Sequence, residues 1–291
     1  KRGKSRRLFK KKKSHSNQRL GCIIAIIVLI PICYGLYLYY QQYSVQHSSK
    51  PQIETSVSLP TPSGKDLEIP VSLIPRQEQI IRHKGYTVSY NKDLKIPNWV
   101  SYELTRQETK GKEKRGDNFI ADPLVKGAIA TNADYARSGY DKGHMAPAAD
   151  MKWSPDVMKE SFYFSNMCPQ HPQLNRRGWK NLEEKIRDWA VADSAIIIIC
   201  GPIIDKPSKT IGKNKVAVPE RFFKVILSPF VKPARGIGFL FNNRQAVEPL
   251  STYAVSIDSI EKLTHMDFFS PLPDEIENAV EANADYYQWP R

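Results

Sequence analysis

The most apolar stretch of the chain runs from Leu20 to Tyr40 and contains 21 residues without a charge. A helix of this length rises about 1.5 Å per residue and would cross the roughly 30 Å hydrocarbon core of a bilayer. Tyrosines gather at its C-terminal end, where an interfacial aromatic belt lies. A cleaved signal peptide has a shorter apolar core, and a buried helix of a soluble domain usually keeps one polar face. The pattern therefore predicts one transmembrane helix over residues 20–40.

The rest of the chain divides into a polar segment and a patterned region. Residues 41–82 contain five prolines and no helical periodicity, which predicts an extended linker. Over residues 83–291, apolar and β-branched runs predict strands at Tyr86–Tyr90, Trp99–Thr105, Phe162–Asn166, Ala195–Cys200 (ended by Gly201-Pro202), Arg221–Leu227 and Gly236–Phe241. Helical spacing of apolar residues predicts a helix over Asn175–Val191 and short helical stretches within 256–269 and 273–283. Strands around a central helix predict an α+β domain.

The charge of the chain is concentrated at its start. Lys and Arg number 43 and Asp and Glu 30, a net charge of +13. Ten of the basic residues lie in residues 1–19, which contain no acid, so residues 20–291 carry a net charge of +3. Because positive charge marks the cytoplasmic side of a span, we expect residues 1–19 in the cytoplasm and the region after Tyr40 outside it, in the periplasm or the extracellular medium. A nucleic-acid-binding tail or nuclear signal is the alternative interpretation.

A second basic group lies between Asp205 and Lys224, where the net charge is +4. Its basic residues are Lys206, Lys209, Lys213, Lys215, Arg221 and Lys224. Such a loop either binds a nucleic-acid backbone without reading its sequence or keeps the domain soluble, and the sequence leaves both interpretations open.

Cysteines are few, namely Cys22, Cys33, Cys168 and Cys200. None of them forms a C-x-x-C pair, which disfavours a zinc site. A disulfide between Cys168 and Cys200 is compatible with an extracytoplasmic domain, but spacing does not decide it.

The densest group of chemically active side chains lies between Ser138 and Asp150, in the sequence SGYDKGHMAPAAD. A histidine such as His144, taken alone, is more often structural than catalytic. A second segment, Ser165–Arg187, follows it and adds Asn, Pro-Gln, Trp, Glu and Arg residues at fixed spacings. The two segments together favour a catalytic role for the histidine.

These segments resemble the DNA/RNA non-specific endonucleases, the ββα-metal (His-Me finger) nucleases that include endonuclease G. The family signature has Asp-Arg-Gly-His before an apolar residue and Ala-Pro, then Ser/Thr-Asn-x-x-Pro-Gln, then Asn-x-x-x-Trp-x-x-x-Glu. The matching segments are Asp141–Pro147, Ser165–Gln170, Asn175–Glu183, and upstream Asn98–Val100 and Arg115–Phe119. The resemblance extends from about residue 85 to near the C-terminus. It implies an α+β ββα-metal fold with a central antiparallel sheet, here preceded by one transmembrane helix.

The resemblance also implies roles for individual residues. His144 would be the general base, since a neutral imidazole accepts a proton near neutral pH. Asn175 would hold one Mg²⁺, or Mn²⁺ or another divalent cation, through its amide oxygen, because Mg²⁺ prefers oxygen ligands and keeps several waters. Glu183 would hold those waters. Arg115 and Arg187 would bind the phosphate as negative charge develops on it.

Lys142 departs from the signature, which usually has Arg at this position. Lysine keeps the positive charge but lacks the planar fork that binds a phosphate at two points. We expect Lys142 to contribute to catalysis and substrate binding beside Arg115 and Arg187, through a weaker contact than arginine would make.

Several of these residues also have structural interpretations. Glu183 and Arg187 have the spacing of an ordinary i,i+4 surface ion pair, Asn175 could be a helix N-cap, and Asp141 could orient its neighbours. The helix charges Arg176, Arg177 and Lys180 are predicted to be solvated, and Trp179 and Trp189 are predicted to lie in the core.

The sequence thus predicts a membrane-anchored, metal-dependent endonuclease that hydrolyses DNA and RNA with little sequence specificity. The alternatives are a catalytically weak nucleic-acid-binding surface protein and a phosphodiesterase acting on small or lipid-linked substrates. The preference for DNA or RNA and the formation of a homodimer are left open.

Overall fold

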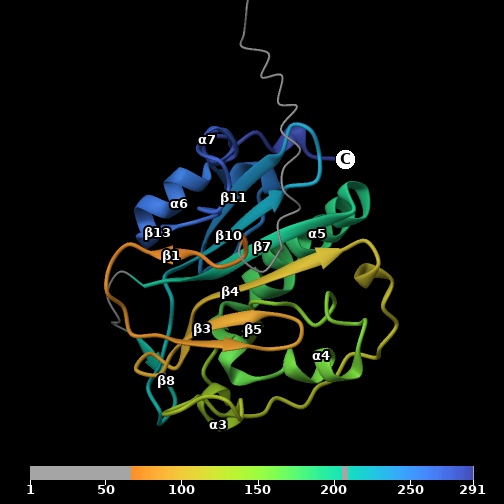
Figure 1. The fold of residues 1–291 in the computed structure, drawn as a ribbon. Helices are drawn as coiled ribbons and strands as arrows, with labels where there is room; N and C mark the ends of the chain where they lie inside the picture. Colours follow the sequence, from red (N-terminus) through yellow and green to blue (C-terminus); the bar gives the residue numbers. More distant parts are fainter. Residues whose placement is uncertain (1–66, 205–208, 291) are drawn as a thin grey trace, which may run out of the picture. The chain divides into compact units, whose positions relative to one another are not determined.

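The computed structural model describes residues 67–204 and 209–290, which lie in the compact unit Thr61–Arg291. Its centre is a seven-stranded antiparallel sheet with strand order β12-β11-β10-β7-β4-β3-β2 (Figure 1). The strands are β2 Gln79–Arg82, β3 Thr87–Asn91, β4 Ile96–Thr105, β7 Ala195–Ile203, β10 Arg221–Ser228, β11 Arg235–Asn242 and β12 Ala254–Val255.

Three two-stranded pairings accompany this sheet, and helices cover it. The pairs are β1 Val71–Ser72 with β13 Met266–Asp267, β5 Asp141–His144 with β6 Met167–Gln170, and β8 Thr210–Ile211 with β9 Val216–Ala217. The helices are α3 Asn132–Tyr135, α4 Pro155–Glu160, α5 Lys180–Asp193, α6 Ile257–Thr264 and α7 Asp274–Glu281, and a π-helical turn, Leu174–Trp179, leads into α5. These elements confirm the predicted α+β class.

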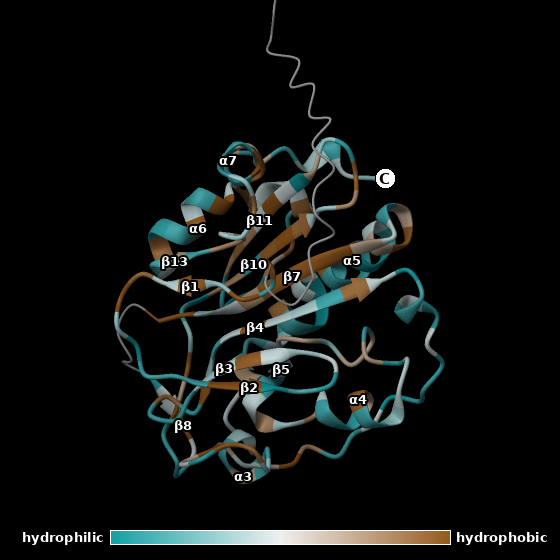
Figure 2. Ribbon diagram, in the orientation of Figure 1, coloured by the Kyte–Doolittle hydropathy of each residue, from teal (hydrophilic) through white to brown (hydrophobic). Residues whose placement is uncertain are grey.

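Strand β7 divides the interior into two cores, because alternate side chains of a strand point to opposite faces. Ile196 and Ile198 join the core beneath α5, while Ile197 and Ile199 join the core beneath α6 and α7. Figure 2 shows the central strands β7 and β10 as hydrophobic along most of their length. Both faces of β7 are buried, as expected for a strand whose sequence is apolar without alternating polar residues.

The predicted strands at Tyr86, Trp99, Arg221 and Gly236 correspond to β3, β4, β10 and β11, and the predicted helix corresponds to the π-helical turn and α5. Strand β7 does not end at Gly201-Pro202 but continues to Ile203. Beyond Cys200 it pairs with β10 alone, so the missing N–H of Pro202 interrupts no ladder on the β4 side.

The predicted strand Phe162–Asn166 is wrong, because a 3-10 turn occupies Phe164–Asn166 and the strand begins at Met167. The Asn166 amide accounts for this difference. It accepts from the Ala146 N–H and donates to the carbonyl oxygens of Ala146 and Ser161, each at 2.8 Å. These side-chain bonds take the place of backbone pairing at residues 164–166, and they connect this turn to Ala146, just after β5.

The folded unit extends upstream of residue 83, into the segment predicted to be linker. Leu67 is buried, β1 pairs with β13, and β2 pairs with β3 at the edge of the main sheet. The predicted tail and span, residues 1–40, lie outside the described residues. No helix within residues 67–204 and 209–290 is long and apolar enough to cross a membrane.

Candidate active site

His144 ends the short strand β5, opposite Met167 of β6. Glycine is required at the preceding position, because a Cβ at Gly143 would lie 2.6 Å from the Cβ of Gln170, which is fixed to the β6 backbone. Trp179 donates its indole N–H to the carbonyl oxygen of His144 at 3.3 Å. The histidine is therefore held between β6 and the helical segment that follows.

The His144 ring lies in an aromatic enclosure and is 8% exposed. The Phe162 ring meets it edge-on at a centroid distance of 5.0 Å, and the Phe119 ring lies at 5.6 Å. Its Nε2 atom has no hydrogen-bond partner among the described residues. Burial, together with the positive charges of Arg115 and Lys142, lowers the pKa of His144 to about 3. The imidazole is therefore neutral at physiological pH, as a general base must be.

Two predicted substrate-binding cations flank the histidine. Arg115 is exposed, and its guanidinium carbon lies 5.5 Å from the centre of the Phe162 ring. Lys142 donates to the Asn132 side-chain oxygen at 2.9 Å, and its ammonium lies 4.2 Å from the centre of the Phe119 ring. Both cations pack on the aromatic residues that enclose His144, which places positive charge beside the base.

Asn175 is connected to β5 through Asp141. Its Nδ2 donates to Oδ2 of Asp141 at 2.9 Å, and Arg176 binds the same carboxylate through Nε and Nη2 at 2.8 and 2.7 Å. An ionised carboxylate is an acceptor, so the amide nitrogen of Asn175 faces Asp141 and its oxygen points elsewhere. This oxygen fits the predicted role of a metal ligand. Asn175 lies within the π-helical turn and does not precede it, so the N-cap interpretation is wrong. Arg176, predicted to be a solvated helix charge, forms an ion pair with Asp141.

Arg187 pairs with Asp150 and not with Glu183, so the interpretation of an i,i+4 surface pair is also wrong. Its Nη1 donates to Oδ1 of Asp150 at 2.7 Å, and the fully buried Asp150 also accepts from the Tyr102 hydroxyl at 2.9 Å. Burial raises the pKa of Asp150, and the bonds to Arg187 and Tyr102 oppose this shift. The arginine is thus held in place by a carboxylate that solvent does not reach.

Glu183 is half-buried one turn before Arg187 on α5. Burial raises the pKa of Glu183 to about 7, while the charges of Lys224, Arg187 and Arg115 lower it in part and that of Asp150 raises it. The charge of Arg115 acts on Glu183 of α5 and also on His144 of β5. The predicted residues of β5, α5 and the Arg115 loop therefore share one electrostatic neighbourhood.

In the sequence, Lys224 belongs to the basic residues of the Asp205–Lys224 segment, but its side chain on β10 is fully buried. Its ammonium lies 4.5 Å from the centre of the Trp179 ring and has no hydrogen-bond partner among the described residues. The sequence indicates a buried position for Lys224, because this lysine lies between apolar residues of the predicted strand Arg221–Leu227. Asp150 was also given no role from the sequence, although it ends the His144 segment.

The remaining basic residues of this group are accessible where the structure describes them. Lys209, Lys213 and Lys215 are exposed around the β8–β9 hairpin, and Lys206 lies outside the described residues. Lys209 donates to the Tyr140 hydroxyl at 2.7 Å, and Tyr140 directly precedes Asp141. The hairpin therefore reaches the start of β5.

Two further predictions have clear outcomes. Trp179 and Trp189 are fully buried in the core beneath α5, as predicted. Cys168 and Cys200 are buried and free, so they do not form a disulfide.

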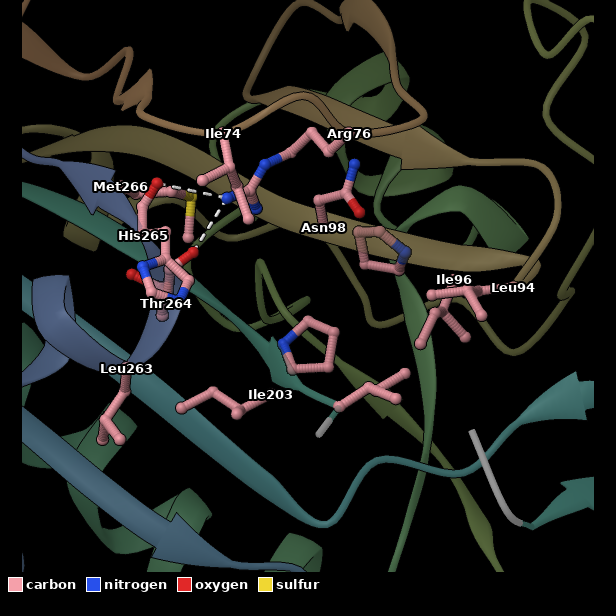
Figure 3. Close-up of a pocket in the computed structure, with 13 residues that line it drawn as sticks. Ile74, Arg76, Leu94, Ile96, Asn98, Ile203, Leu263, Thr264, His265 and Met266 are labelled. Carbon is pink, nitrogen blue, oxygen red and sulfur yellow. Dashed lines mark hydrogen bonds between the residues drawn. The ribbon is translucent and has the colours of Figure 1, made fainter. Parts of the chain in front are cut away.

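A pocket of about 220 Å³ lies away from these residues, between the start of the unit and the end of α6 (Figure 3). Arg76 crosses it and donates to the carbonyl oxygens of Thr264 and His265 at 2.8 and 3.3 Å. No candidate catalytic residue lines the pocket. Its arginine is already bound by protein groups.

The chain is similar to known nucleases in both sequence and structure. The DNA/RNA non-specific endonuclease family profile matches residues 63–275. A nuclease from Nostoc sp. is 30% identical over 250 residues, which cover 81% of this chain and 88% of that protein. Mitochondrial endonuclease G from Homo sapiens is 33% identical over 213 residues, covering 67% of this chain and 71% of that protein.

A chain in the crystal structure of the EndoG/EndoGI complex has a TM-score of 0.64 at 29% identity, covering 69% of this chain and 89% of its own length. The predicted α+β fold with a central antiparallel sheet, similar to that of endonuclease G, is therefore confirmed. The chain belongs to the DNA/RNA non-specific endonuclease family and is a non-specific nuclease, a hydrolase.

Proposed function

We propose that His144 is the general base of this nuclease and that Asn175 holds one Mg²⁺ at the same site. The observation that carries the proposal is the state of His144: it is buried, neutral and without a partner at Nε2. A structural histidine in a core normally satisfies both ring nitrogens. An unpaired neutral nitrogen is free to take a proton from a water that attacks a phosphate. A phosphate bound by Arg115 and Lys142 would offset the positive charges that lower the pKa of His144.

The cations around His144 complete the proposed chemistry. Arg115 and Lys142 would bind the phosphate oxygens, where they oppose the negative charge of the transition state. Arg187, held by Asp150, would add a guanidinium from α5. Because these groups contact phosphate and not base edges, they would act on DNA and RNA with little sequence preference.

Asn175 fits a magnesium ligand because Asp141 occupies its amide nitrogen and leaves its oxygen for another partner. Glu183 would orient waters of the ion as an ionised acceptor. When bound, the divalent cation supplies Lewis-acid stabilisation of a phosphate oxygen and of the leaving 3′ oxygen. Mn²⁺ would serve in the same oxygen-lined setting.

The β8–β9 hairpin supports binding of a polyanion beyond the scissile phosphate. Its exposed lysines reach Tyr140 beside β5. We therefore assign this hairpin to contact with the sugar-phosphate backbone of the substrate. High salt is then expected to weaken substrate binding.

The test compares digestion of plasmid DNA and of RNA by wild type and His144→Asn with Mg²⁺ present. Loss of a general base typically costs about 10²–10⁴-fold in rate. His265→Asn is the matched control, because His265 is exposed and its backbone is left-handed, with a φ of 53°, which asparagine tolerates. A His144→Asn enzyme as active as His265→Asn would overturn the role of His144. Equal turnover of a small phosphodiester and a DNA duplex would overturn the polymeric substrate.

We also propose that residues 20–40 anchor the enzyme in a membrane with the nuclease domain outside the cytoplasm. The uncharged run beside ten basic residues supports this proposal. Protease added to intact cells is expected to remove the nuclease domain, whereas protection with an intact membrane would reverse the orientation. Extraction of the enzyme by alkaline carbonate would overturn the anchor itself.

A further inference from the structure

A group of five acidic side chains gathers on α6, β13 and α7. These elements pack on the second core, whereas Met145 and Ala146, which directly follow His144, belong to the core beneath α5, so the group lies across the sheet from His144. Figure 1 shows the three elements close together.

Carboxylate oxygens of Asp258, Glu261 and Glu281 lie within 4.8 Å of one another, and so do those of Asp267, Glu277 and Glu281. Glu281 is thus shared by two triads. The elements that carry the group pack on the sheet through Ile257, Ile260 and Val280 in the second core.

The acidic group has no ion-pair partner among residues 67–204 and 209–290, and the nearby positive charge of Lys262 acts only on Glu261. The Phe268 N–H donates to Glu261 at 2.8 Å. Carboxylates brought together without a counterion repel one another and lose hydration.

Glu281 is the member that the protein leaves least satisfied. It is 7% exposed, and its Oε1 atom has no hydrogen-bond partner among the described residues; Oε1 of Glu277 also has none. Burial, together with the charges of Glu261 and Glu277, raises the pKa of Glu281 to about 9. A buried, unpartnered carboxylate at the point shared by two acidic triads indicates a missing positive ligand.

We propose that this acidic group is a calcium site in which Glu281 is the central ligand. Calcium takes six to eight oxygen ligands at about 2.3–2.6 Å, so opposite oxygens lie about 4.6–5.2 Å apart. The oxygens of each triad lie no more than 4.8 Å apart, which is close enough for one calcium ion to contact all three. The set contains no His or Cys, which separates it from zinc sites. Mg²⁺ demands a smaller octahedral shell and keeps several waters, which suits a crowded carboxylate set less well.

The bound ion would connect α6, β13 and α7, which otherwise repel one another through these carboxylates. Its expected effect is on stability, since the site lies across the sheet from the catalytic residues. A ligand that binds the folded chain alone stabilises it by RT ln(1 + L/Kd), where L is the free ligand concentration, so the melting temperature rises with ligand concentration. Calcium is therefore expected to raise the melting temperature of the protein.

The experiment measures Ca²⁺ binding by calorimetry and melting temperature with Ca²⁺ or with chelator, on the full chain. The substitution Asn175→Ala is included to remove the proposed catalytic ion. Asn175→Ala, which lacks the proposed catalytic ion, is expected to bind one Ca²⁺ per chain, and both it and wild type are expected to melt several degrees higher with Ca²⁺. Glu281→Gln is expected to lose both effects, whereas Glu275→Gln, an exposed acid on the same helix, keeps them.

The melting temperature of Glu281→Gln in chelator shows whether this variant folds. Because it removes an unpaired buried carboxylate, it should melt no lower than wild type in chelator. Retention of the calcium shift in Glu281→Gln would overturn the site, as would its absence from wild type. Loss of the shift in Asn175→Ala would assign it to the catalytic ion instead, and an equal shift with Mg²⁺ would overturn the choice of calcium.

Discussion

The two faces of the central sheet differ in how their acidic side chains are paired. Beneath α5, Asp150 is fully buried but bound to Arg187 and Tyr102, and Asp141 is bound to Arg176 and Asn175. Beneath α6 and α7, five acids meet without an ion pair to a described residue. Paired acids position other side chains, whereas unpaired acids gathered in one place are arranged for a ligand from solution. Pairing therefore distinguishes the carboxylates that position catalytic side chains from the carboxylates of the proposed calcium site.

The largest expected effect follows from breaking the pairing of Asp150. Asp150→Ala leaves Arg187 without its partner, and breaking a buried pair costs about 3–5 kcal/mol. The free energy of unfolding from urea titration, measured at neutral pH with chelator, is the readout. The double substitution Asp150→Ala/Arg187→Met should recover part of the loss, because it leaves no unpaired charge. A loss below that of an ordinary surface substitution would show that the pair is not structural.

The matched change on the other face has the opposite sign. The folded-state pKa of Glu281, about 9, lies above its ordinary value of 4.5. Between these values the folded chain holds a proton that the unfolded chain has released, so stability falls as pH rises through this range. Glu281→Gln in chelator should therefore gain stability over wild type, and the gain should grow from pH 5 to pH 9. Equal losses for Asp150→Ala and Glu281→Gln would remove the distinction between the faces.

An intermediate effect is expected from Asp141, which orients a proposed metal ligand. Asp141→Asn replaces the carboxylate with an amide that can both accept and donate a hydrogen bond, so either the oxygen or the nitrogen of the Asn175 amide could face it. Loss of such a supporting contact typically costs about 10–100-fold in metal affinity or activity. The readout is the Mg²⁺ concentration that gives half-maximal digestion. Arg176→Gln, which removes the exposed partner of the same carboxylate, should change it far less; equal effects would argue that Asp141 acts through Arg176.

The smallest expected effect concerns the charge that Lys224 places near Glu183. Burial raises the pKa of Glu183 to about 7, and Lys224 lowers it in part, so Glu183 gains its proton as pH falls through this value. Lys224→Met should raise that pKa and move the acid limb of kcat/KM to higher pH. His144, with a pKa of about 3, should not contribute to this limb. Lys213→Met, an exposed lysine of the hairpin, is the control, and an acid limb that moves equally in both variants would contradict the role of Lys224.

The sequence by itself was sufficient for the fold class and the family. Apolar runs located β7 and β10, because a strand buried on both faces commonly has a nearly continuous apolar sequence. The ordered motifs around His144, Asn175 and Glu183 were sufficient for the nuclease assignment. The span over residues 20–40 remains a prediction from its length and charge.

The tertiary structure decided the partners of each charged side chain, since partners come from segments far apart in the chain. Spacing on a helix paired Arg187 with Glu183, but the fold supplied Asp150, 37 residues away, in a more buried position. A count of charge groups Lys224 with the basic residues of the Asp205–Lys224 segment, whereas its strand carries it into the core. The acidic group around Glu281 is invisible in the sequence, because α6, β13 and α7 bring its members together only when they pack on the sheet. Local patterns determine which elements form, and the packing of those elements determines which charges meet.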